Sequence, residues 1–225
     1  ALSFEQACTL PVTWSTTHVA VARARLRAGR SIIVQAAAGG VGLKAVEYAH
    51  GLCTVSIGTA GRPHKHAQLR TTGVDALCSS RDGAAFATGA ARLSEAERAE
   101  AALNSLSLDF IAASFASLGE GGAFMEVGKR GIWASGRHVA SASATTYCAI
   151  ALDADMAREP AWMHGVLALL ATRAEGGTAT IVRRARLHLR AVPQRLRCRG
   201  KHVVAVLVAV AQPAHKASAR VLGAE

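Results

Sequence analysis

The apolar pattern is clearest over residues 30–60, where a short apolar run leads into glycines and then into a helical pattern. Residues 30–42 join a run typical of a buried strand to a glycine-rich turn that opens a helix. A second apolar run, at residues 53–57, follows at the distance that a strand–helix–strand unit requires. Between the two runs, Val41, Leu43, Val46 and Ala49 have the spacing of one apolar helix face. The pattern predicts two parallel strands joined by a helix.

The sequence after residue 155 shows one helical pattern and two strand patterns. Residues 156–170 are predicted to form a helix. Residues 179–192 alternate apolar and basic side chains with a period of two, which is typical of a half-buried strand, and residues 203–210 are typical of a buried one. We therefore expect one α/β domain over residues 1–175 and a segment with two further strands over residues 176–225.

The turn after the first strand has the spacing of a dinucleotide-binding fingerprint. Ala37, Gly39 and Gly42 occupy its three small-residue positions, and Gly40 and Val41 lie between them. Small residues let the backbone turn sharply and approach a pyrophosphate, and the first amides of the helix attract the negative charge. The alternative is a strand-to-helix turn whose glycines serve packing alone.

The second strand ends without a carboxylate. Sites for NAD usually place Asp or Glu there to bind the ribose 2′-hydroxyl, whereas residues 58–61 are Gly, Thr, Ala and Gly. The nearest cations in the sequence are Arg62, Lys65 and Arg81. Small residues and cations can accept a 2′-phosphate, so the sequence predicts a preference for NADPH.

Several separated segments resemble one known family. They are residues 2–12, 26–29, 36–42, 65–74, 79–82, 103–106 and 121–129. In this order, and with Ala-Ala-Ala-Gly-Gly-Val-Gly at 36–42, the sequence is similar to the enoylreductase domain of polyketide and fatty acid synthases, within the medium-chain reductase superfamily that includes quinone oxidoreductases. The resemblance covers most of residues 1–165 and implies a doubly wound α/β fold, a Rossmann domain.

The resemblance also implies roles for individual residues. Lys129 would lie beside the nicotinamide as proton donor, and Asp153 would lie near the active site. From the residues alone, Lys129 could equally be an exposed loop charge, and Asp153 could cap the helix at 156–170. The implied cofactor-binding residues are Ala37, Gly39, Gly40, Val41, Gly42, Thr59, Lys65, Arg81, Asn104, Ser105 and Gly128. The implied partners are a carrier-bound enoyl thioester, neighbouring synthase domains and a second copy of the chain.

Some positions depart from the family pattern. Gln35 stands where the family often has His, and Arg130 and Gly131 replace a common Thr-Asp or Phe-Asp. Residues 95–102 are charged and alanine-rich, so a helix is predicted where the family has a central strand. The sequence begins at the lead-in to the nucleotide-binding domain, so we expect it to lack most of the barrel-like substrate domain. The resemblance implies that residues 176–225 are a basic, strand-helix-strand remnant of that domain.

The amino-acid composition is typical of a globular protein with a hydrophobic core. The chain has 225 residues, of which 51% are hydrophobic and 4% aromatic, enough for a sizeable core built from small side chains. The sequence has no signal peptide and no apolar run of transmembrane length, which favours a cytoplasmic protein. Its five cysteines are scattered without a Cys-x-x-Cys pair, so neither a metal site nor a disulfide framework is expected.

The net charge of +11 is concentrated near the C-terminus. Residues 176–225 hold ten Lys and Arg against one acidic residue. Without an accompanying recognition motif, this predicts nonspecific polyanion binding rather than specific nucleic-acid recognition. Three functions remain open from sequence: an NADPH-dependent enoyl reductase domain or its cofactor half, a catalytically inactive remnant within a synthase, and an NADPH quinone oxidoreductase.

Overall fold

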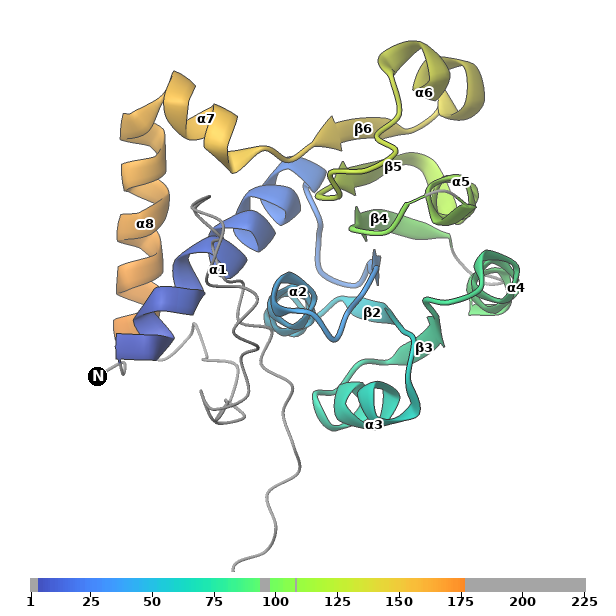
Figure 1. Cartoon of the computed structure of the whole chain (residues 1–225), viewed down its shortest axis with the longest axis horizontal. Coiled ribbons are helices and arrows are strands. Elements are labelled where there is room, and N and C mark those ends of the chain that lie inside the picture. Colours follow the sequence, from blue (N-terminus) through green and yellow to red (C-terminus); the bar gives the residue numbers. More distant parts are fainter. Residues whose placement is uncertain (1–3, 94–97, 108, 177–225) are drawn as a thin grey trace, which may run out of the picture.

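A six-stranded parallel sheet organises the chain, with strand order β3-β2-β1-β4-β5-β6 (Figure 1). The computed structural model describes residues 4–93, 98–107 and 109–176. The strands are β1 (Ser31–Val34), β2 (Val55–Ala60), β3 (Ala76–Ser79), β4 (Ala99–Asn104), β5 (Leu118–Glu126) and β6 (Thr146–Ala149). The helices are α1 (Phe4–Ala24), α2 (Gly40–Gly51), α3 (Pro63–Thr71), α4 (Gly83–Leu93), α5 (Asp109–Ala116), α6 (Ser135–Ala142), α7 (Leu152–Arg158) and α8 (Pro160–Glu175). The expected doubly wound Rossmann fold is confirmed.

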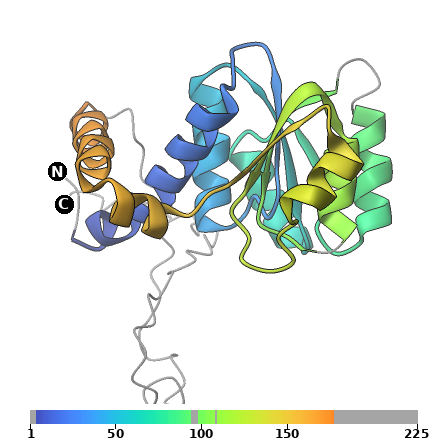
Figure 2. The ribbon, with the colours of Figure 1, turned by 90° about the horizontal axis from the view of Figure 1, so that it is seen from above.

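Helices cover both faces of the sheet, as Figure 2 shows. In β1, Ile32 and Val34 belong to one apolar cluster with residues of α1, α2 and α3. Ile33 points to the opposite face and joins a second cluster with residues of α4 and α5. Because successive strand side chains alternate between faces, a strand buried on both sides must be apolar throughout. This accounts for the continuous apolar run at residues 32–34.

The predicted helix at residues 95–102 is wrong over residues 99–102, which belong to β4. This strand lies between β1 and β5 and pairs with both. Ala101 and Ala102 are 1% and 0% exposed and belong to the clusters on opposite faces. Alanine favours a helix locally, but here two neighbouring strands supply the backbone partners and both faces are buried. Residues 95–97 lie outside the described residues.

Two other predicted boundaries differ from the structure. The second strand runs from Val55 to Ala60 rather than over residues 53–57, because Cys53 has a positive φ of 55° in the turn before it. The predicted helix at 156–170 is two helices, α7 and α8, with a break at Glu159 before Pro160. Asp153 is in the first turn of α7, whose N-cap is Ala151, so Asp153 is not the helix cap.

Helix α8 packs against α1 rather than against the sheet. Leu10 and Trp14 of α1 form an apolar cluster with Met163, Val166 and Leu170 of α8. No helix in the described ranges is long and apolar enough to cross a membrane. The predicted segment at 176–225 lies outside the described residues apart from Gly176, so the domain boundary stays a prediction.

Candidate functional site

The predicted site residues meet at one edge of the sheet. The turn at 36–42 follows β1, Thr59 is near the end of β2, and Arg81 follows β3. Asn104 ends β4, with Ser105 after it, Gly128 and Lys129 follow β5, and Asp153 follows β6. All six strands are parallel, so these positions share the carboxyl edge, where ligands of open α/β sheets bind.

The turn between β1 and α2 can close tightly only because its residues are small. A Cβ atom at Gly42 would lie 2.6 Å from both the Ala36 carbonyl oxygen and the Ala37 Cα. At Gly39 it would lie 3.2 Å from the same carbonyl oxygen. Within the described part of the chain, no side chain caps the start of α2. The first amides of α2 are therefore free to bind a phosphate group, so the turn fits a dinucleotide.

A buried network of polar side chains is hydrogen-bonded to the backbone of this turn. Gln35 is 2% exposed; its Nε2 donates to the Ser114 hydroxyl at 2.8 Å, and its Oε1 accepts from the Thr59 hydroxyl at 2.8 Å. The Thr59 oxygen in turn accepts the Ala36 N–H at 2.9 Å. Ala36 has φ of +50°, a conformation that a non-glycine residue adopts only when its surroundings impose it. The network supplies that constraint.

Thr59 and Ser105 therefore contact the turn itself. Thr59 is fully buried, and its hydroxyl is used by Gln35 and Ala36. The Ser105 hydroxyl donates to the Gln35 carbonyl oxygen at 3.3 Å, which ties the loop after β4 to the end of β1. Direct contact of either residue with a cofactor stays a prediction.

Basic residues surround the end of β2. A side chain at Gly61 would collide with the stem of Arg81, so Arg81 lies across the end of this strand. His66 Nε2 lies 2.7 Å from the Ala60 carbonyl oxygen. Lys65 is half-buried on α3, and Arg62 is exposed as the N-cap of that helix. Arg81 thus lies at this strand end, and Arg62 and Lys65 belong to the start of the helix that follows it.

Lys129 and Asp153 lie side by side, although they are separated by 24 positions in the chain. Their Nζ and Oδ1 atoms are 3.9 Å apart, and the two side chains are 70% and 81% exposed. The pair stands at the edge formed by β5 and β6. An exposed ammonium group beside a carboxylate is available to a ligand bound over this edge.

Sequence reasoning missed Glu126 as a functional candidate. This carboxyl group ends β5 and is 1% exposed. Burial raises its pKa to about 7, partly offset by hydrogen bonds from Asn104 and the Gly128 backbone. The signal was present in the sequence, because Glu126 is the one charged residue in the apolar run 123–127. The role of Gln35 was also missed, since only the packing of three strands and α5 reveals its partners.

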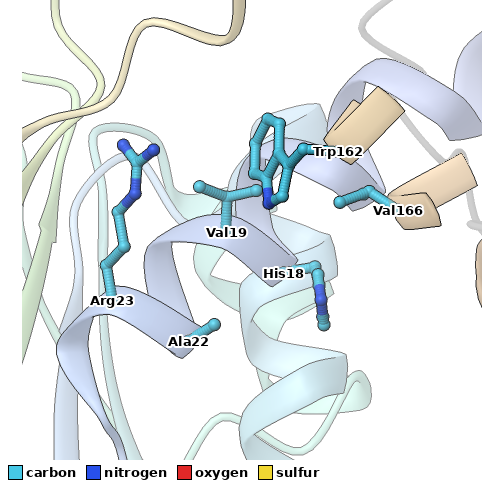
Figure 3. A pocket seen from close by; sticks show the side chains of 6 residues that line it. All are labelled: His18, Val19, Ala22, Arg23, Trp162 and Val166. Carbon is cyan, nitrogen blue, oxygen red and sulfur yellow. The ribbon is translucent and has the colours of Figure 1, made fainter. Parts of the chain in front are cut away.

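A cavity of about 250 Å³ lies elsewhere, between α1 and α8 (Figure 3). It is lined by His18, Val19, Ala22, Arg23, Trp162 and Val166. Its polar side chains already have partners: Arg23 pairs with Asp155 at 2.8 Å, and His18 bonds the Tyr48 hydroxyl at 2.8 Å. Burial, and then the charge of Arg173, lowers the pKa of His18. The predicted site residues are not among the lining residues.

The described ranges contain no group of three or more His, Cys, Asp or Glu side chains placed to hold a metal ion. A scan against protein-family models finds no match.

Curated relatives are polyketide synthases. The highly reducing polyketide synthase ZEA2 of Gibberella zeae is 38% identical over 136 residues, which are 59% of this chain and 6% of that protein. The spectinabilin polyketide synthase system protein NorB of Streptomyces orinoci is 38% identical over 171 residues, 74% of this chain and 8% of that protein. The chain thus spans a small part of the length of these relatives.

Solved structures locate that part. CurK enoyl reductase is 28% identical with a TM-score of 0.76, over 81% of this chain and 55% of that one. The nucleotide-binding subdomain of the enoylreductase domain of PpsC from Mycobacterium tuberculosis is 26% identical with a TM-score of 0.69, over 77% of this chain and 98% of that one. A mycobacterial protein solved with NADPH shares the fold at 21% identity and a TM-score of 0.69, over 79% of this chain and 55% of that one.

Proposed function

Because the chain belongs to the enoyl reductase domains of polyketide synthases and corresponds to their nucleotide-binding subdomain, we propose that it binds NADPH as the cofactor half of an enoyl-thioester reductase. The observation that carries this proposal is the turn after β1. Its glycines let the backbone turn tightly, and the uncapped start of α2 offers amides to a pyrophosphate. NADPH supplies the hydride when it is bound.

The preference for NADPH rests on the end of β2. Arg81 lies against Gly61, with Lys65 and Arg62 nearby on α3 and at its N-cap. A 2′-phosphate at this place would be close to cations, and the glycine at position 61 would not block it. A ribose 2′-hydroxyl would lack its usual carboxylate acceptor. Arg81 is therefore the residue that we propose to select NADPH.

The proposed chemistry places Lys129 and Asp153 at the reacting end of the cofactor. Reduction at the β-carbon of an enoyl thioester leaves an enolate, which needs a nearby cation and then a proton at the α-carbon. The Lys129 ammonium can meet both needs, and Asp153, 3.9 Å away, can orient it. The proposed substrate is carried on an acyl carrier protein, within a synthase whose neighbouring domains contact this one.

A second copy of the chain is also a proposed partner. β6 is an outer strand of the sheet, so one row of its backbone groups has no neighbouring strand within the described residues. Such an edge can pair with another strand. Sedimentation of the purified chain tests this, and a monomer at all concentrations would contradict it.

The cofactor proposal is tested by titrating the chain with NADPH and with NADH while following cofactor fluorescence. We expect NADPH to bind more tightly, and Arg81→Ala to weaken NADPH binding about tenfold with little effect on NADH, because one charge-assisted contact is lost. Arg70→Ala, which removes an exposed cation at the far end of α3, is the matched control and should change neither. Tighter binding of NADH would overturn the proposal.

A further inference from the structure

Glu126 is a buried carboxyl group at the carboxyl edge of the sheet, directly before the loop that bears Lys129. It ends β5 and is opposite Asn104, which ends β4, in the register of the two strands. Both side chains are buried, at 1% and 0% exposure. A buried carboxyl group costs folding free energy unless its contacts repay it, so its position at a ligand-binding edge calls for a function.

One carboxylate joins two loops. Glu126 Oε2 accepts from Asn104 Nδ2 at 2.9 Å, and Oε1 accepts from the Gly128 N–H at 2.6 Å. Asn104 Nδ2 also donates to the Leu106 carbonyl oxygen at 2.7 Å. Both groups that face the carboxyl oxygens are therefore donors, one at the end of β4 and one in the loop after β5.

The backbone is shaped for this contact. A Cβ atom at Gly128 would lie 2.6 Å from Glu126 Oε1, so glycine is needed for the amide to approach the carboxylate. The Val127 N–H donates to the Asn104 carbonyl oxygen at 2.8 Å, which adds a backbone tie between the same loops. The position of Lys129, one residue after Gly128, depends on these contacts.

Neutral donors face Glu126 where a cation would be the usual partner. Its pKa is raised by burial, and the groups that oppose this shift are the Asn104 amide and the Gly128 N–H. On β6, the pKa of Tyr147 is raised by its own burial and then by Glu126. Beyond the loop lies the exposed ion pair of Lys129 and Asp153.

We propose that Glu126 is a positioning residue: its carboxylate holds Asn104 and the Gly128 backbone together, and thereby places Lys129 and the loop after β4 for the cofactor. The inference rests on the proposed NADPH site for its functional consequence. The holding of the two loops is independent of it, because it follows from the hydrogen bonds alone. Glu126 acts through Asn104 and Gly128 rather than on the reacting atoms.

The variant Glu126→Gln separates positioning from mere structural support. Glutamine has one acceptor oxygen and one donor group, so it cannot accept from both Asn104 and Gly128. At pH 8 we expect the Gly128 amide to exchange with deuterium about tenfold faster, while the urea midpoint of global unfolding stays equal or rises, because a buried charge is removed. Glu120→Gln, at an exposed position of the same strand, should change neither.

The proposal requires faster exchange of the Gly128 amide without a lower urea midpoint. Unchanged exchange at Gly128 would overturn the proposal, and so would faster exchange together with a lower urea midpoint, since that combination describes a structural role.

A parallel NADPH titration tests the functional consequence. Weaker NADPH binding by Glu126→Gln, with Glu120→Gln like the wild type, supports positioning at the cofactor site. Equal binding by all three proteins would overturn that consequence. Failure of the wild type to bind NADPH would overturn the proposed cofactor function instead, and the exchange experiment would still decide the role of Glu126 in holding the loops.

Discussion

At the scale of single residues, Gly42 is the position where the turn tolerates least change. A Cβ atom there would lie 2.6 to 2.7 Å from three backbone atoms of Ala36 and Ala37, which cannot move without opening the turn. We expect Gly42→Ala to lower the free energy of unfolding by about 3 kcal/mol. Urea unfolding followed by circular dichroism measures this loss.

Gly51, at the other end of α2, is the matched control. A Cβ atom there meets none of the described atoms within 4 Å. Gly51→Ala should therefore be neutral or raise the stability by up to about 1 kcal/mol, because alanine loses less backbone entropy in a helix. Equal losses in the two variants would show that the close approach at Gly42 does not govern stability.

The Glu126 carboxyl group makes a prediction about pH. Its pKa is raised from 4.5 to about 7 in the folded protein, so between these values the folded state binds more protons than the unfolded state. The contribution of Glu126 to stability is thus greatest at low pH and declines as the pH rises through this range. Replacing it with glutamine should remove the decline.

Urea unfolding at pH 5 and at pH 8 tests this linkage. The stability of Glu126→Gln relative to the wild type should rise between the two pH values by up to about 3 kcal/mol, since one pKa unit corresponds to about 1.4 kcal/mol. Glu120→Gln again serves as the comparison. A constant difference between Glu126→Gln and the wild type would mean that Glu126 does not titrate with a raised pKa.

At the scale of elements, α7 is joined to α1 by a partly buried ion pair. The Asp155 side chain is 9% exposed and lies 2.8 Å from Arg23 of α1. Asp155→Asn keeps the shape but removes the charge, so we expect a loss of about 2 kcal/mol in the free energy of unfolding.

The more exposed ion pair of Arg27 and Glu100 is the control. The Arg27 side chain is 70% exposed, and Glu100→Gln should lower the free energy of unfolding by about 0 to 1 kcal/mol. Losses of the reverse order in urea titrations would contradict this reading.

Some helices and strands were predicted correctly from the sequence and others were not. The unit from β1 to β2 was predicted because its signals are local: an apolar run, small residues at fixed spacing and a helical face. β4 was not, because the alanines at 99, 101 and 102 carry a helical propensity that only the strands on either side override. The break between α7 and α8 had a local signal, Pro160, that the apolar pattern of 156–170 concealed.

At the scale of the whole molecule, the proposed reduction is tested in a larger protein. The chain covers 55% of the CurK enoyl reductase chain, so turnover is measured with this chain in place of the matching part of that reductase. In that setting we expect Lys129→Ala to lower the reduction of an enoyl thioester at least about tenfold, as loss of a general acid does, with little change in NADPH affinity. Arg130→Ala, the exposed neighbour, is the control. Turnover by Lys129→Ala equal to that of the wild type would remove Lys129 from the mechanism.

The sequence by itself determined the glycine-rich turn after β1, the parallel α/β class and the resemblance to enoyl reductase domains, because each is carried by short segments and by their order along the chain. It also indicated the candidates that gather at the carboxyl edge, since the ends of parallel strands meet there. Only the tertiary structure decided that β4 is a strand, that Gln35 and Thr59 hold the turn, and that Glu126 is buried against Asn104 and Gly128. These features depend on burial and on partners supplied by neighbouring strands, and local propensity contains no information about either.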